Sequence, residues 1–85
     1  MFNLINITAK AERELKRLDR TTKNRIVTAI FALEKDSRPH GCLKVKTSEG
    51  LWRIRVGDWR VGYEINDAAQ EVTIVAIAHR REFYE

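Results

Sequence analysis

The fold of this 85-residue chain is decided by the stretch Leu51-Trp52-Arg53-Ile54-Arg55-Val56-Gly57-Asp58-Trp59-Arg60-Val61-Gly62-Tyr63-Glu64-Ile65-Asn66. Residues 51–56 alternate between apolar and basic side chains, which is the period of a half-buried strand. Residues 59–66 alternate in the same way, with an apolar side chain at every odd position. Gly57-Asp58 lies between the two runs and is a two-residue turn of the kind that closes hairpins. The stretch therefore predicts a β-hairpin with one apolar face.

The other face of this hairpin is basic. A two-residue turn places Arg55 directly across from Arg60, while Arg53 faces Gly62 on the same side of the sheet. Like charges placed opposite each other destabilise a sheet, so the three arginines are best explained by an anionic ligand. Their forked guanidinium groups suit phosphate. The alternative is an ordinary solvated strand face.

Two lysines add to this charge in the run just before the hairpin. Lys44 and Lys46 alternate with Leu43 and Val45, which predicts that the apolar pair points inward and that the lysines share the other face. If this strand neighbours the hairpin, we expect the arginine face to hold five cations. Both lysines are therefore candidates for binding a polyanion.

The remaining chain supplies two helices and more strands. We expect a strand over 2–7, a helix over 9–18 with Thr8 as its N-cap, a second helix over about 22–35, and strands over 42–46 and 72–77. This order of strand, two helices and four strands predicts a single α+β domain over residues 1–85. Its sheet is mainly antiparallel with four or five strands, a helical hairpin covers one face, and the arginine face lies on the open side.

Charge and composition narrow the classes of function. The net charge is +4, and residues 37–63 hold six basic side chains against two acidic ones, which favours a polyanionic partner such as nucleic acid. The single Cys42 excludes an internal disulfide and a multi-cysteine metal site, and the two histidines have no metal-ligand spacing. Without a signal-peptide pattern or an apolar run of membrane length, we expect a cytoplasmic protein with no membrane contact.

The tail that follows the last predicted strand carries further candidate site residues. Arg80 comes off the end of that strand and is placed to bind a phosphate, with Arg81 beside it. His79 and Tyr84 are the candidates for moving a proton. The alternatives are a surface histidine at a strand end and a packing aromatic near the terminus.

An enzyme built on these residues has to work by positioning and charge, because the sequence holds no metal or cofactor motif. Cleavage of RNA fits that limit. The 2′-hydroxyl of RNA is an internal nucleophile, so the protein needs only to orient it, shift protons and stabilise the pentavalent phosphate.

The sequence 52–61 followed by Ile77-Ala78-His79-Arg80-Arg81-Glu82-Phe83-Tyr84 resembles the RelE branch of the RelE/ParE toxin superfamily. The order of elements also matches, so the resemblance covers essentially the whole chain. It implies a type II toxin that cuts messenger RNA in the ribosomal A site as a metal-independent endoribonuclease. It also implies a partner, a RelB-like antitoxin that wraps the toxin and hides or distorts its site.

The resemblance also implies roles for particular residues. Basic residues at the two outward positions of the first hairpin strand are matched by Arg53 and Arg55, and the arginine after the turn is matched by Arg60. The family's arginine after the last strand is matched by Arg80, and its C-terminal tyrosine is matched by Tyr84. In the family these groups bind the scissile phosphate and its neighbours, and the tyrosine orients a base. A basic residue in the preceding strand is matched by Lys46; with Lys44 and Arg81 it is a candidate for RNA binding.

One departure concerns the general base. Members with lysines in the hairpin strand have a proton acceptor there, whereas arginine hardly ever deprotonates. With Arg53 and Arg55 in those places, the base is His79, Tyr84 or a group of the ribosome or RNA. His79 is slightly favoured over Tyr84, because its ordinary pKa lies nearest neutrality.

Two other functions compete with RNA cleavage. The ParE-like sister class shares the fold and poisons DNA gyrase without enzymatic activity, and a decayed toxin would be an inactive antitoxin-binding module. The intact set of four arginines and Tyr84 favours the ribonuclease. We expect operator DNA to be contacted only through the antitoxin complex, chiefly by the antitoxin itself.

Overall fold

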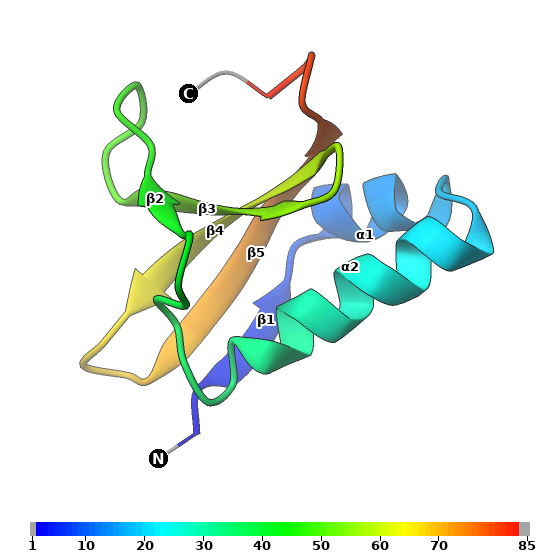
Figure 1. Ribbon diagram of the computed structural model, residues 1–85. Helices are drawn as coiled ribbons and strands as arrows, with labels where there is room; N and C mark the ends of the chain where they lie inside the picture. The colour runs from blue at the N-terminus through cyan, green and yellow to red at the C-terminus, as the bar shows by residue number, and fades with distance from the viewer. Residues whose placement is uncertain (1, 84–85) are drawn as a thin grey trace.

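The computed structural model describes residues 2–83, which form five strands and two helices (Figure 1). In chain order they are β1 (Leu4–Ile7), α1 (Ala9–Lys16), α2 (Arg20–Ala32), β2 (Leu43–Lys44), β3 (Leu51–Val56), β4 (Trp59–Asn66) and β5 (Glu71–His79). The predicted α+β class and the predicted order of elements are confirmed. None of the helices within these residues is long and apolar enough to span a membrane.

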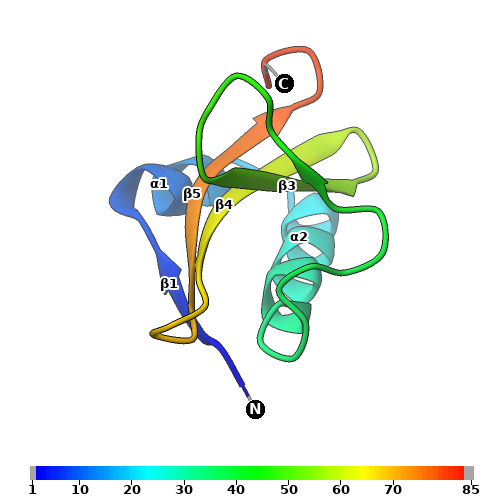
Figure 2. The same ribbon diagram turned by 90° about the vertical axis from the view of Figure 1, so that its left-hand side faces the viewer.

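The strands form one mixed sheet in the order β1-β5-β4-β3-β2. β1 runs parallel to β5, and the other three pairings are antiparallel. Figures 1 and 2 show both helices on the same side of this sheet, while the C-terminal segment and the loop before β3 rise on the other side. Within residues 2–83 no helix covers the side away from α1 and α2, as the sequence predicts, although the C-terminal segment and the loop before β3 cross part of it.

The hairpin of β3 and β4 has the predicted register. Arg55 is paired with Arg60 and Arg53 with Gly62, and Gly57 in the turn has a φ of 61°. The apolar face of the hairpin packs against the helices, with these side chains among those of the core: Ile26, Ile30, Leu33, Ile54, Val61 and Tyr63. Burial of that face stabilises the domain and leaves the basic face outward.

Each helix begins at a side-chain cap. The Thr8 hydroxyl accepts a hydrogen bond from the Ala11 amide at 3.2 Å, so the predicted N-cap of α1 is confirmed. Asp19 caps α2 by accepting from the Thr22 amide at 3.2 Å. The second helix thus begins at Arg20, slightly before the predicted start at about residue 22, because the cap satisfies its first free amides. These hydrogen bonds lower the pKa of the Asp19 carboxyl.

A bulge in β5 explains its nearly continuous apolar sequence. Tyr63 of β4 pairs with Ile74, but the preceding Gly62 pairs with Ala76, so Val75 is the extra residue. An extra residue reverses the alternation of side chains. Ile74 and Ile77 consequently both face the core, at 0% and 2% exposure.

The predicted facing of β2 is wrong. Leu43 is paired with Arg53 and Lys44 with Trp52, so Leu43 shares the arginine face and Lys44 points to the opposite side. Leu43 is 52% exposed rather than inward, whereas Val45 is buried as predicted. Leu43 and Lys44 do lie on opposite sides of the sheet, as alternation predicts. The pairing of β2 with β3 decides which of the two sides each residue takes.

Candidate active site on the arginine face

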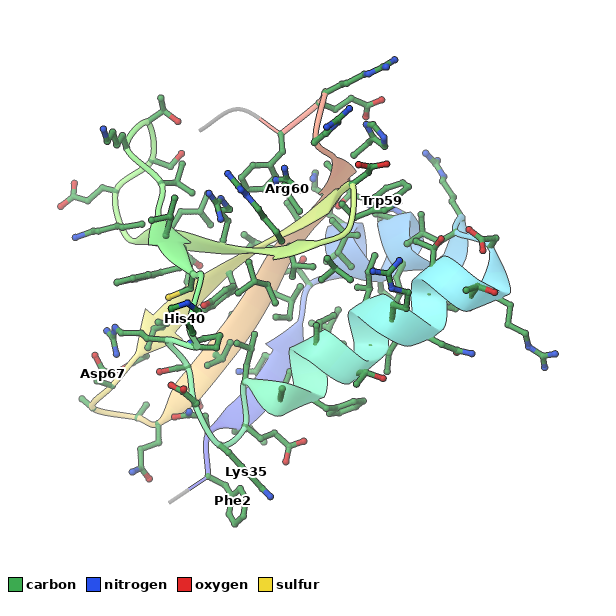
Figure 3. The ribbon with its side chains drawn as sticks, viewed as in Figure 1. Phe2, Lys35, His40, Trp59, Arg60 and Asp67 are labelled. Atoms are coloured by element: carbon green, nitrogen blue, oxygen red, sulfur yellow. The ribbon has the colours of Figure 1, made fainter. Side chains whose placement is uncertain are left out.

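The arginine face, formed by Arg53, Arg55 and Arg60, is the candidate site. Its outer end lies at the hairpin turn, where Arg55 is exposed and directly opposite Arg60. The Arg60 guanidinium donates to the carbonyls of Gly57 and Trp59 at 3.2 and 3.0 Å. Figure 3 shows Arg60 on the side of the sheet away from the helices. Arg60 is thus held against the turn with the exposed Arg55 directly opposite it, which suits the binding of an anion.

The residue after β5 brings a further cation to that turn. The Arg80 amide donates to the Asp58 carbonyl at 2.7 Å, which ties the end of β5 to the hairpin. The Arg80 Nε lies 3.8 Å from the Asp58 carboxylate, and the Arg80 side chain is 56% exposed. The fold therefore brings Arg80 to the same turn as Arg55 and Arg60, although it lies 20 positions after the nearer of them in sequence.

Arg53 occupies the inner end of the arginine face and is only 1% exposed. Its guanidinium donates to the Gly41 carbonyl at 3.3 Å. A buried arginine is held by its surroundings, so the structure differs from the prediction that Arg53 is open to a phosphate in the same way as Arg55. The strand pattern places Arg53 on the correct face but does not reveal what covers it.

Phe83 is part of that cover, and the sequence analysis did not single it out. The amides of Glu82 and Phe83 donate to the His79 carbonyl at 2.8 and 3.1 Å, which turns the chain back over the open face. A Cβ on Gly62 would lie 3.1 Å from two ring atoms of Phe83. The ring therefore packs directly on the strand beside Arg53. Tyr84, the predicted tyrosine of the site, lies outside the described residues.

His79 lies on the other side of the sheet from the arginines. It is paired with Trp59, and the two rings meet edge to face with centroids 5.6 Å apart. The His79 Nδ1 accepts from the Arg81 amide at 3.3 Å. The expected grouping of His79 with the arginine face is thus wrong, because the alternation of β5 directs its side chain toward the helix side.

The three candidates for RNA binding lie at different places in the fold rather than together on the arginine face. Lys44 points away from the arginine face, as its pairing with Trp52 requires. Lys46 and Arg81 are exposed, one in the loop after β2 and the other in the C-terminal turn. The expected cluster of five cations on one face is not formed.

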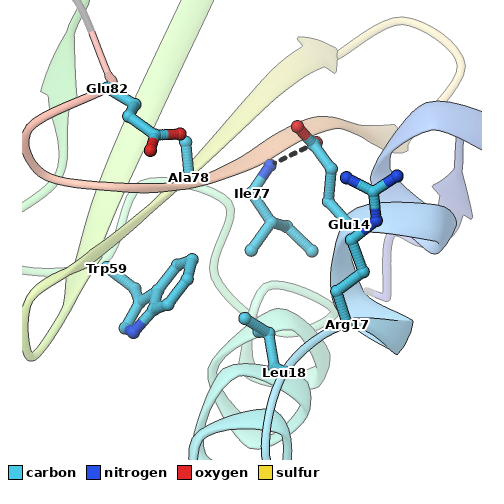
Figure 4. Close-up of a pocket in the computed structure, with 7 residues that line it drawn as sticks. All are labelled: Glu14, Arg17, Leu18, Trp59, Ile77, Ala78 and Glu82. Carbon is cyan, nitrogen blue, oxygen red and sulfur yellow. Dashed lines mark hydrogen bonds between the residues drawn. The ribbon is translucent and has the colours of Figure 1, made fainter.

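A separate pocket lies on the helix side, between α1, the end of β5 and Trp59 (Figure 4). Its volume is about 200 Å³. The Glu14 carboxylate in it accepts from the Ile77 amide at 2.9 Å, beyond the point where β1 stops pairing with β5. Glu14 thus satisfies an edge amide of the sheet, which is a structural role. Within residues 2–83 no group of three or more histidine, cysteine or acidic side chains is placed to hold a metal.

The fold and the charged face together are those of a class of small toxins. Residues 5–84 match the family described as ParE toxin of type II toxin-antitoxin system, parDE, and the chain belongs to that family. It is 37% identical to Toxin RelE of Mycobacterium tuberculosis (strain ATCC 25618 / H37Rv), over 82 residues that make up 94% of this chain and 84% of that protein. The chain is a RelE-like toxin of a type II toxin–antitoxin system.

Solved structures confirm the fold. The archaeal RelE–RelB complex from Pyrococcus horikoshii OT3 contains a chain with a TM-score of 0.84 and 23% identity, covering 98% of this chain and 100% of that one. The toxin–antitoxin complex RelBE2 from Mycobacterium tuberculosis gives a TM-score of 0.80 at 24% identity, with coverage of 94% and 100%.

Proposed function

We propose that this toxin is a ribosome-dependent endoribonuclease that cuts messenger RNA in the ribosomal A site. The observation that carries the proposal is the convergence of Arg55, Arg60 and Arg80 at one turn on the open face. Three guanidinium groups there match the charge of an RNA phosphate and its neighbours. The similarity to a protein named Toxin RelE supports the same assignment.

In the proposed reaction the 2′-oxygen forms a bond to the adjacent phosphorus and the bond from phosphorus to the 5′-oxygen breaks. One proton leaves the 2′-hydroxyl and another reaches the departing 5′-oxygen. Arg55, Arg60 and Arg80 stabilise the extra negative charge of the pentavalent phosphate, which is the largest contribution that fixed cations make. The reaction as written requires no metal.

The base in this proposal is not an arginine, since guanidinium groups stay protonated. The position of His79 beside Trp59, away from the arginine face, argues against our preference for it. The candidates that remain for the base are Tyr84, which lies outside the described residues, and a group of the ribosome or RNA.

A cognate RelB-like antitoxin is the proposed protein partner. Similar chains of known structure come from a RelE–RelB complex of Pyrococcus horikoshii and from the toxin–antitoxin complex RelBE2 of Mycobacterium tuberculosis. We expect binding to block the arginine face, and operator DNA to be contacted through the complex rather than by the toxin alone.

Primer extension on a defined messenger tests the proposal, with purified antitoxin-free toxin and with or without programmed ribosomes. Cuts within the A-site codon that require ribosomes are expected. Cuts on naked RNA would show a free ribonuclease instead. Absence of cuts in both reactions, from protein shown to be folded, would refute the ribonuclease.

The second candidate is a non-enzymatic poison of DNA gyrase. It is favoured by the family match, whose description names the ParE toxin. Supercoiling by gyrase in the presence of the toxin separates the two. Arg60→Ala or Arg80→Ala abolishes toxicity in the ribonuclease but leaves gyrase poisoning largely intact.

A further inference from the structure

The loop between α2 and β2 reaches the inner end of the arginine face. Its Gly41 has a φ of 91° and presents the carbonyl that accepts from the Arg53 guanidinium. No heavy atom lies within 4 Å of a Cβ built on Gly41, so this glycine serves the backbone conformation rather than a close approach. The position of the loop therefore restrains Arg53.

Two anchors fix the N-terminal half of this loop to the sheet. The buried Tyr63 hydroxyl donates to the Ser37 carbonyl at 2.8 Å. The Arg38 guanidinium donates to both oxygens of the Asp67 carboxylate at 3.0 and 2.9 Å. Figure 3 shows Asp67, in the turn between β4 and β5, close to the loop segment that carries His40. The loop is thus joined to a turn 29 residues away in sequence.

Arg38 also lies on an aromatic ring. Its guanidinium carbon is 5.0 Å from the centre of the Trp52 ring, within the range of a cation–π contact. Trp52 is the residue that precedes Arg53 in β3. A planar guanidinium with a bidentate partner and an aromatic surface is held more firmly than an ordinary surface ion pair. The pKa of Asp67 is lowered by the hydrogen bonds from Arg38.

We infer that Arg38, Trp52 and Asp67 form a clamp that holds the 36–42 loop against the sheet, so that the Gly41 carbonyl fixes the Arg53 guanidinium. In this arrangement Arg38 and Asp67 are positioning residues, because they act through the loop and do not reach the phosphate site. The consequence for RNA cleavage rests on the proposed function, whereas the effect on Arg53 does not.

The test compares wild-type toxin with Asp67→Asn, which removes the charge while keeping the size of the side chain. The Nη–H signals of the Arg53 guanidinium, whose Nη1 donates to the Gly41 carbonyl, are followed by NMR and assigned by their loss in Arg53→Lys. We expect hydrogen exchange at these Nη–H groups to be about fivefold faster in Asp67→Asn, the order of one well-formed ion pair. Glu12→Ala is the matched control, because it removes an exposed pair with Lys16 on α1, and it leaves the Arg53 signal unchanged.

The same variants are then compared in single-turnover cleavage on programmed ribosomes. With saturating toxin the cleavage rate falls about fivefold in Asp67→Asn, with unchanged binding and only a small loss of stability. Unchanged exchange at Arg53 in Asp67→Asn would overturn the clamp. If exchange is faster in Asp67→Asn but the wild-type toxin cuts no RNA, the clamp is upheld and the proposed function is refuted. The two failures are therefore distinguishable.

Discussion

The two ends of the arginine face differ although the same alternation of residues produces both. At the hairpin turn Arg55 is exposed and paired with Arg60, and Arg80 is bound to Asp58 of the same turn. Two residues earlier in β3, Arg53 is only 1% exposed. Its guanidinium donates to the Gly41 carbonyl of the loop, and Phe83 packs on Gly62, the residue paired with Arg53. One end is an exposed cationic surface, and the other is built like a core.

This difference shows that facing and access are separate properties of a strand. Register decides which side of the sheet a side chain takes, and here it places all three arginines together. Access depends on which segments cross that side of the sheet. For Arg53 these segments are the 36–42 loop and the C-terminal turn. Under the proposed function we therefore expect direct phosphate contact at the outer end and support of the site at the inner end.

The largest expected effect comes from the outer end. Arg60→Ala and Arg80→Ala each lower the rate of A-site cleavage about 10²–10³-fold, as removal of one group that stabilises transition-state charge does. Melting stays close to wild type, because neither side chain is buried. Lys44→Ala is the matched control on the opposite side of the sheet and retains cleavage. A loss in the control equal to that in Arg80→Ala would contradict the assignment.

The second largest effect is expected from Gly62→Val, which lowers stability at the inner end of the arginine face. The new side chain meets the Phe83 ring, which already lies 3.1 Å from the position of a Cβ, and overpacking of this kind costs about 1–3 kcal/mol of stability. Urea unfolding measures the loss. In a Phe83→Ala background the same substitution costs clearly less, and an equal cost in both backgrounds would show that Phe83 is not the obstacle.

Tyr63→Phe weakens the loop that supports Arg53. The free energy of unfolding falls by about 1 kcal/mol, since the hydroxyl gives up its hydrogen bond to the Ser37 carbonyl. Burial raises the pKa of this Tyr63 hydroxyl, so it remains a donor at neutral pH. Thr28→Ala removes an exposed hydrogen bond to the Asn24 carbonyl and serves as the smaller reference; a larger loss there would argue against the anchor.

The smallest effect is the pH dependence of the Arg38–Asp67 pair. Because the pKa of Asp67 is lowered in the folded protein, the pair stabilises the fold fully above the ordinary carboxyl pKa of 3.8 and loses that contribution as the pH falls through the folded value. The stability difference between wild type and Asp67→Asn, measured by urea unfolding, is therefore present at pH 7 and disappears in acid. A difference that persists at low pH would have another cause.

Local pattern was sufficient for much of the fold. The hairpin register, the Thr8 cap and the helices on one face follow from periodicity and turn chemistry, which act over a few residues. The facing of Leu43 and Lys44 was predicted wrongly, because a two-residue strand has too little pattern to choose a side without its partner. His79 was misplaced because the β5 bulge changes which positions face the helices.

The sequence by itself determined an α+β fold with three arginines on one face of a hairpin, since alternation and a two-residue turn leave one register. Only the tertiary structure decided which of those arginines is accessible. It brought Arg80 to the hairpin turn and laid Phe83 on Gly62, and it carried the Gly41 carbonyl to Arg53. These contacts join segments 12 or more residues apart, and their geometry depends on how the loops cross the sheet rather than on local periodicity.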